Sequence, residues 1–156
     1  MANALLSPLG AANRELLAGA AGTAAMTAAQ TAYYRATDTE SSSTPAEVGK
    51  RIVEGVLGRE LPEQRMDALN QGMHWLYGTS WGLPFGLVAG SRRRRRSLLA
   101  DGVGFGLAIW AASRGQMAAM QLAPPPWRDP PSTLAMDLGF HLLYGAAAAV
   151  AFRALR

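Results

Sequence analysis

The chain has 156 residues, of which 49% are hydrophobic, and a formal net charge of +4. It contains no cysteine, which excludes a disulfide framework and any metal site built on cysteine. Its charged residues gather in 35–67 and 92–96 and leave long stretches almost free of charge. Those stretches approach ~20 residues, the length of a helix that crosses a hydrocarbon layer of ~30 Å. The sequence therefore predicts an all-α, polytopic membrane protein with a single domain.

The first predicted span covers about 16–34 and is rich in alanine and glycine. Gly19 and Gly22 are small enough to let a second helix approach closely. The segment lacks the basic-then-apolar order of a cleavable signal peptide, so we expect it to be retained. One polar stripe at helical spacing is formed by Thr23, Thr27, Gln30 and Thr31.

A charged connection follows over 36–65 and contains a predicted amphipathic helix. Thr44, Pro45 and Glu47 have the residue types of an N-cap, a first-turn proline and a capping-box glutamate. Such a helix could lie on the membrane surface or cover the bundle, and a plain packed connector is the expected role. Its apolar face is expected to consist of Val48, Ile52, Val53, Val56 and Leu57.

Three further spans are predicted, and two loops separate them. Pro84 lies inside the second span and should kink it, because proline cannot donate a backbone hydrogen bond. A proline-rich turn at 124–131 follows the third span. The predicted bounds of the second, third and fourth spans are about 68–89, 98–122 and 133–155.

Five consecutive arginines lie in the loop 91–97. Such a run can bind nucleic acid, but between two closely spaced membrane spans it fits the positive-inside rule better. Together with Arg14 and the C-terminal arginines, it predicts a multi-pass protein of the bacterial inner membrane with both termini cytoplasmic. The expected partner is the lipid bilayer, and no nucleic-acid partner is expected.

A heptapeptide occurs twice, at 72–78 and again at 139–145, with five of seven positions identical. The two copies contain the only histidines, His74 and His141. We therefore predict two duplicated hairpins in the same orientation, which is a parallel repeat. The glycines that begin and end each copy are predicted to pack helices closely, and they are Gly72, Gly78, Gly139 and Gly145.

Depths calculated from the helical rise of ~1.5 Å per residue place several polar side chains in one layer of the outer leaflet. Arg114 and Asp137 are predicted to form an ion pair there, because an isolated arginine in the hydrocarbon is costly. Tyr77 and Tyr144 follow the histidines by one turn and are candidate partners for them. The layer consists of Gln30, His74, Arg114, Gln116, Asp137 and His141.

Three interpretations of the histidines remain open at this stage. The first is hydrogen bonding that joins helices. The second is a b-type haem held by His74 and His141, since bundles build such sites from facing helices. The third is a polar translocation path or proton relay that also uses Arg114 and Asp137. The sequence shows no catalytic constellation and no metal-ligand cluster, so an enzyme is the least favoured class.

The organisation resembles the YagU-like family of uncharacterised bacterial inner-membrane proteins. The resemblance rests on the small-residue first span, the early histidine of the second, the proline-rich turn and the Gly-Phe-His-Leu stretch at 139–142. It implies a polytopic inner-membrane protein, with a link to acid tolerance in at least one member. It implies no catalytic residues.

These observations together predict a non-enzymatic role. The chain would be a small transporter, a channel-like element or an accessory subunit of a larger membrane complex. The many glycine and alanine faces favour a homo-oligomer or docking on a partner. The alternative is an electron-transfer subunit in which the two histidines bind haem b.

Overall fold

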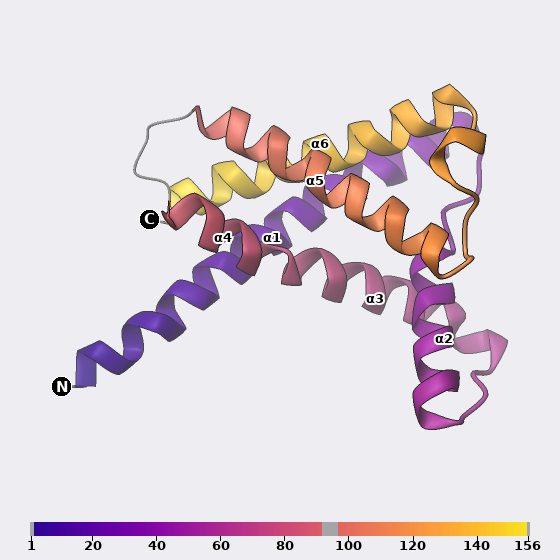
Figure 1. The fold of residues 1–156 in the computed structure, drawn as a ribbon, viewed down its shortest axis with the longest axis horizontal. Helices are drawn as coiled ribbons and strands as arrows, with labels where there is room; N and C mark the ends of the chain where they lie inside the picture. Colours follow the sequence, from indigo (N-terminus) through magenta and orange to yellow (C-terminus); the bar gives the residue numbers. More distant parts are fainter. Residues whose placement is uncertain (1, 92–96, 156) are drawn as a thin grey trace.

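The computed structural model describes residues 2–91 and 97–155, and both stretches are helical without any strand (Figure 1). The predicted all-α fold is confirmed. The arginine run 92–96 lies outside the described residues. The helices are α1 (Ala2–Thr37), α2 (Thr44–Leu57), α3 (Met66–Ser80), α4 (Gly82–Ser91), α5 (Leu98–Ala119) and α6 (Pro131–Ala154), with short 3-10 turns at Glu63–Arg65 (η1) and Pro126–Arg128 (η2).

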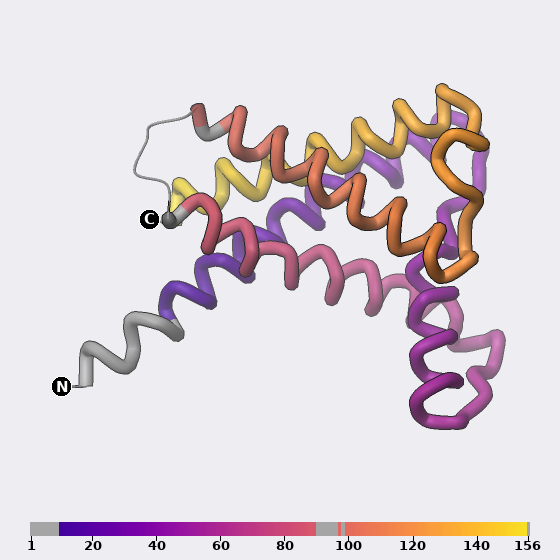
Figure 2. Tube along the Cα trace, in the orientation of Figure 1, coloured from indigo at the N-terminus to yellow at the C-terminus, as the bar shows by residue number. Residues whose placement is uncertain are grey.

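Two long helices, α1 and α6, form the centre of the bundle. α6 packs against both α5 and α1, and α1 packs in turn against α3 and α4. The chain passes back and forth, so that the end of α4, the start of α5 and the end of α6 lie at one end of the bundle (Figure 2). The end of α1, the whole of α2 and the turn after α5 lie at the opposite end (Figure 1).

The predicted kink near Pro84 is confirmed as a break between two helices. α3 ends at Ser80 and α4 begins at Gly82, with Trp81 between them. Proline has no N–H, and its ring collides with the carbonyl group four residues earlier, which here belongs to Ser80. The predicted span 68–89 is therefore two helices of 15 and 10 residues.

The start of α2 is held differently from the prediction. The helix includes Thr44, and its flanking residue Ser43 makes no capping bond with its side chain. The Thr44 N–H instead donates to Ser42 Oγ at 3.3 Å, and the Ala46 N–H donates to Asn70 Oδ1 of α3 at 3.0 Å. The predicted capping box is wrong, because a side chain from another helix takes the role of the cap.

The interior combines aromatic rings with alanines. One cluster of buried residues joins Met26 of α1 and Ile109 of α5 to the α6 residues Phe140, Tyr144 and Ala148. A second cluster, nearer the end of α6, consists of Ala18, Phe85, Ala149 and Phe152. The rings of Phe85 and Phe105 lie 4.8 Å apart between their centroids, and Phe105 packs against both clusters.

Backbones touch where the helices cross, and glycine makes this contact feasible. A Cβ built on Gly145 of α6 would collide with the Gly102 carbonyl oxygen of α5, and one on Gly106 would collide with the His141 carbonyl oxygen. On the other side of the bundle, a Cβ on Gly78 of α3 would collide with the Thr23 hydroxyl of α1. These contacts fix the distance between helices in both halves.

Gly19 and Gly22 of α1 also have the predicted packing role. A Cβ on Gly19 would collide with the Thr79 carbonyl oxygen, and one on Gly22 would lie 2.8 Å from the Tyr144 ring. The structure gives Gly72 and Gly139 no such role within the chain, because a Cβ on either would meet nothing within 4 Å. Each copy of the heptapeptide therefore begins with an open glycine and ends with a packed one.

Within residues 2–91 and 97–155, one helix is both long and apolar enough to cross a membrane by length and composition, namely α6. Of its most apolar window, 28% is buried inside the bundle. The other three predicted spans do not meet the same test for visible reasons. α1 contains Thr23, Thr27 and Gln30, α5 contains Asp101 and Arg114, and the second span is divided at Trp81.

Alanine substitutions at the four heptapeptide glycines test these contacts. We expect Gly145→Ala and Gly78→Ala to lower the free energy of unfolding by about 1–3 kcal/mol, the usual cost of overpacking. Gly139→Ala and Gly72→Ala are the matched controls on the same helices. They should be neutral or stabilising by up to about 1 kcal/mol, because alanine favours a helix over glycine. Thermal unfolding of the purified variants measures the difference, and equal effects at all four sites would contradict these helix crossings.

Candidate functional site

His74 of α3 is hydrogen-bonded to α1. Its Nε2 lies 3.0 Å from the Thr27 hydroxyl oxygen, and that hydroxyl also lies 2.8 Å from the Thr23 carbonyl oxygen. A hydroxyl has a single proton, and a carbonyl oxygen can only accept, so Thr27 donates to Thr23. The Thr27 oxygen must then accept from His74, which means that Nε2 of this histidine carries a proton.

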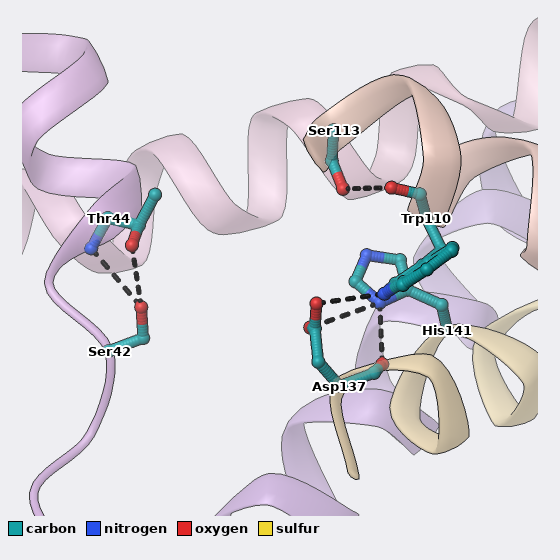
Figure 3. A network of polar contacts seen from close by, with 6 residues as sticks. All are labelled: Ser42, Thr44, Trp110, Ser113, Asp137 and His141. Carbon is teal, nitrogen blue, oxygen red and sulfur yellow. Dashed lines mark hydrogen bonds and ion pairs between the residues drawn. The ribbon is translucent and has the colours of Figure 1, made fainter. Parts of the chain in front are cut away.

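His141 of α6 has a different set of partners (Figure 3). Its Nδ1 lies 2.8 Å from the backbone carbonyl oxygen of Asp137 and 3.4 Å from the Asp137 carboxylate. A carbonyl oxygen accepts, so Nδ1 of His141 carries the proton. The neutral ring then has its lone pair on Nε2, and among the described residues no hydrogen bond reaches that nitrogen.

The two histidines therefore differ in tautomer, although their heptapeptides match. In the neutral forms the His74 ring keeps its lone pair on Nδ1, whereas the His141 ring keeps it on Nε2. The two copies of the motif are chemically distinct in the folded chain.

Asp137 joins α6 to α5 through Trp110 (Figure 3). The indole Nε1 donates to Asp137 Oδ2 at 3.0 Å, while the other carboxylate oxygen lies beside His141. Trp110, Asp137 and His141 thus form one network across the α5–α6 pair. Trp110 was not among the predicted site residues, because a tryptophan in an apolar segment is usually expected to pack or to lie at a membrane interface.

The predicted Arg114–Asp137 pair is wrong. Arg114 forms its ion pair with Asp129, in the turn that follows η2. Both side chains are 15% exposed, so the pair is largely buried. Arginine has a long apolar stem and can extend its charged group well beyond the level of its own backbone. That reach takes the Arg114 guanidinium to the turn, while Asp137 is satisfied by Trp110 and His141.

The two motif tyrosines bond to other helices and not to the histidines. Tyr144 of α6 donates to the Gly78 carbonyl oxygen of α3 at 2.6 Å. Tyr77 of α3 donates to Gln116 Oε1 of α5 at 3.4 Å. Each tyrosine therefore connects one half of the bundle to the other. Gln30, also predicted for this layer, is half-buried on α1, and its side chain makes no hydrogen bond to the described part of the chain.

The predicted polar layer is thus a set of separate connections between helices. Thr27 with His74 joins α1 to α3, Tyr77 with Gln116 joins α3 to α5, and Asp137 with Trp110 joins α6 to α5. Thr27 was not predicted as the partner of His74, although the sequence already placed it in the polar stripe of the first span. In residues 2–91 and 97–155, no group of three or more metal-binding side chains is present.

No protein-family model, no curated protein and no solved structure matches this chain. The resemblance to the YagU-like family therefore rests on its short sequence motifs alone and stays a prediction.

A double-mutant cycle tests the Thr27–His74 bond. Thr27→Val and His74→Ala should each destabilise the fold, and their coupling free energy should be about 0.5–1.5 kcal/mol, the usual net contribution of a hydrogen bond. Thr31→Val is the matched control, since Thr31 is exposed on the same helix one turn later. Unfolding of the four proteins gives the coupling, and a value near zero for the Thr27 pair would refute the bond.

Charge swaps distinguish the two proposed partners of Arg114. Arg114→Asp and Asp129→Arg should each lower the melting temperature, because each leaves a buried charge without its counter-ion. The double swap should restore much of the loss, since it restores opposite charges at the same two positions. The control double swap of Arg114 and Asp137 should restore none. If only the double swap of Arg114 and Asp137 restores the melting temperature, Arg114 pairs with Asp137 and the pair with Asp129 is refuted.

Proposed function

We propose that this chain is a small integral membrane protein of the bacterial inner membrane, with four spans arranged as two duplicated hairpins. Its role is non-enzymatic, and an accessory subunit of a larger membrane complex fits the geometry best. The observation that carries the proposal is the distribution of large apolar side chains, which lie mainly on the outside of the bundle.

Every helix of the bundle presents large aliphatic residues outward. Examples are Leu17 on α1 (57% exposed), Leu76 on α3 (67%), Leu87 on α4 (71%), Leu107 on α5 (48%) and Val150 on α6 (55%). Burying such a side chain stabilises a protein in water by about 1.5–3 kcal/mol. In this fold, each helix of the bundle leaves at least one such side chain exposed and lacks that stabilisation. Hydrocarbon as the surrounding solvent removes the cost, because lipid tails are as apolar as leucine.

The interior supports the same conclusion. Glycines and alanines lie at the helix crossings, and threonine, histidine and tyrosine bond across them. Helices in lipid gain little from burying leucine against leucine, so they associate through close backbone contact and interhelical hydrogen bonds. Both features are present in the α1–α3 and α5–α6 pairs.

The duplication is supported by the position of the terminal glycine in each heptapeptide. Gly78 lies at the crossing of α3 with α1, and Gly145 lies at the crossing of α6 with α5. In each proposed hairpin, the second span therefore touches the first at the same point of the motif. The two hairpins then meet along α1 and α6.

The accessory role is supported by the hydrogen-bond partners of the polar side chains. Within the described residues, His74, Tyr77, Asp137 and Tyr144 all bond to neighbouring helices. Groups bonded in this way hold a bundle together, whereas a conduction path requires groups that solvent or cargo can reach. The proposed protein therefore acts as a rigid partner for other membrane subunits, and a transporter or channel-like element is the second form of the same proposal.

Haem binding remains the alternative function, and one observation favours it. The His141 Nδ1 donates to a backbone carbonyl group, which is the usual orientation of a ligating histidine and leaves Nε2 for the metal. The second proposed ligand fits less well, because His74 uses Nε2 to bond Thr27. A second axial ligand would require that bond to break, so the geometry ranks haem below the accessory role.

Single cysteines test the four-span topology, since the chain has none of its own. Position 60 lies in the connection after α2, and position 97 directly precedes α5. Figure 1 shows that α2 and the start of α5 lie at opposite ends of the bundle, so Glu60→Cys and Ser97→Cys report the two sides of the membrane. In intact cells with a permeabilised outer membrane, an impermeant maleimide should label Glu60→Cys and leave Ser97→Cys unlabelled until the inner membrane is opened. Equal labelling of both in intact cells would contradict four spans.

Purification in native lipid nanodiscs tests the accessory role. We expect a colourless particle in which the 16.5 kDa chain is joined by a second membrane polypeptide in a fixed ratio. A particle holding this chain alone, with ion flux that Asp137→Asn abolishes after reconstitution, would instead establish the transporter. A haem absorption band that His141→Ala removes would establish the alternative.

A further inference from the structure

One apolar stripe of α2 changes from buried to exposed along the helix. Val48, Ile52 and Val56 are spaced four residues apart and therefore lie on one helical face. Their side chains are 8%, 47% and 76% exposed in that order. Leu57, next to Val56, is 63% exposed. The first turns of this face are covered by α3, and the last turns extend past it.

The covered half of α2 is firmly attached. Asn70 of α3 accepts from the Ala46 N–H and donates to the Ser42 carbonyl oxygen, each at 3.0 Å. A Cβ on Gly49 would lie 2.8 Å from the Met73 side chain, so the two helices are in close contact at that point. Arg51 also donates to the Met120 carbonyl oxygen at the end of α5. These bonds set the direction in which the second half of α2 extends.

That direction is across the bundle. In Figure 1, α2 lies crosswise to α1, α3, α5 and α6 at one end of the molecule, and its second half projects sideways beyond α3. If the bundle helices run along the membrane normal, α2 lies in the plane of the membrane surface. The exposed part of its stripe continues the face that contacts Leu69 and Met73, which are inside the first turns of α3.

We propose that α2 is an interfacial helix, with Ile52, Val56 and Leu57 inserted among lipid headgroups and the adjoining acyl chains. The proposal rests on the proposed function, because it needs the bundle to span the bilayer. A helix of this type buries its apolar face about 5–10 Å into the headgroup boundary. In this arrangement α3 covers the apolar face of the first half of α2, and lipid covers the same face of the second half.

The charges of α2 indicate which kind of lipid surface it suits. Glu47 and Glu54 balance Lys50 and Arg51 within the helix. With no net charge, apolar insertion provides the attachment and anionic lipid is not required. A protein partner is less suitable, since three aliphatic side chains offer far less than the ~800 Å² per partner of a stable protein interface. The turn after α5 lies at the same end of the bundle and includes Trp127 of η2, which is 81% exposed and suits the role of an interfacial aromatic anchor.

Spin labels at single cysteines test the proposal on the full chain in nanodiscs of zwitterionic phosphatidylcholine. Val56→Cys reports the apolar stripe, and Glu47→Cys is the matched control on the opposite face of the same helix. Collision with oxygen, which concentrates in lipid, should be several-fold more frequent at position 56 than at 47. Collision with a water-soluble nickel chelate should show the reverse order.

A third label separates this proposal from the one on which it rests. Leu143→Cys lies on α6 and is 41% exposed on the bundle surface. If positions 143 and 56 both contact the nickel chelate freely, the membrane-spanning bundle itself is refuted. If position 143 lies in lipid while 56 contacts the chelate, only the interfacial helix is refuted. Protection of position 56 from both reagents would also overturn it, because a second copy or another protein then covers the stripe.

Discussion

The architecture depends on backbones that touch at glycine. Gly145 lies against Gly102 in the α5–α6 pair, and Gly78 lies against the Thr23 side chain in the α1–α3 pair. At this separation polar side chains of one helix reach those of its partner: His74 of α3 bonds Thr27 of α1, and Trp110 of α5 bonds Asp137 of α6. A larger residue at either crossing would separate the helices and remove the hydrogen bonds that depend on the short distance. Close approach therefore comes first, and the polar network follows from it.

The polar network in turn explains why the histidines of the two heptapeptides differ. His74 faces α1, where a threonine already bonded to its own helix can only accept, and so Nε2 holds the proton. His141 lies one turn after Asp137 on its own helix, and the carbonyl oxygen there takes a proton from Nδ1. The tautomer of each ring is set by its neighbours and not by its motif. Two copies that share five of seven residues therefore contain two chemically different histidines.

Much of the fold could be predicted from the sequence. The helices at 98–119 and 131–154 begin and end near their predicted bounds, because arginine and proline runs mark their limits. The break before Pro84 and the packing role of Gly78 and Gly145 follow from the chemistry of proline and glycine. The site was less predictable, since the rotation of each helix decides which side chains meet. The sequence showed that Thr27 belongs to a polar stripe of its helix. It did not show that His74 lies on the face of α3 that contacts this stripe.

The Arg114–Asp137 ion pair was predicted from the depth of each residue along its helix, and this estimate gave the wrong partner. A depth estimate uses backbone positions, whereas the Arg114 guanidinium lies at the end of a flexible stem and reaches Asp129 in the turn. Asp137 instead accepts a hydrogen bond from the indole N–H of Trp110, for which no role was predicted. Long side chains and aromatic donors are the residues for which spacing alone carries the least information.

The division at Trp81 has a consequence for how the chain would enter a bilayer. At ~1.5 Å per residue, the 15 residues of α3 extend roughly 22 Å and the 10 of α4 roughly 15 Å, so neither alone reaches across ~30 Å of hydrocarbon. Both pack against α1, which the ribosome makes earlier. In the proposed arrangement, α1 serves as a template during biogenesis, and the broken segment becomes a stable crossing only once it has assembled along that earlier helix.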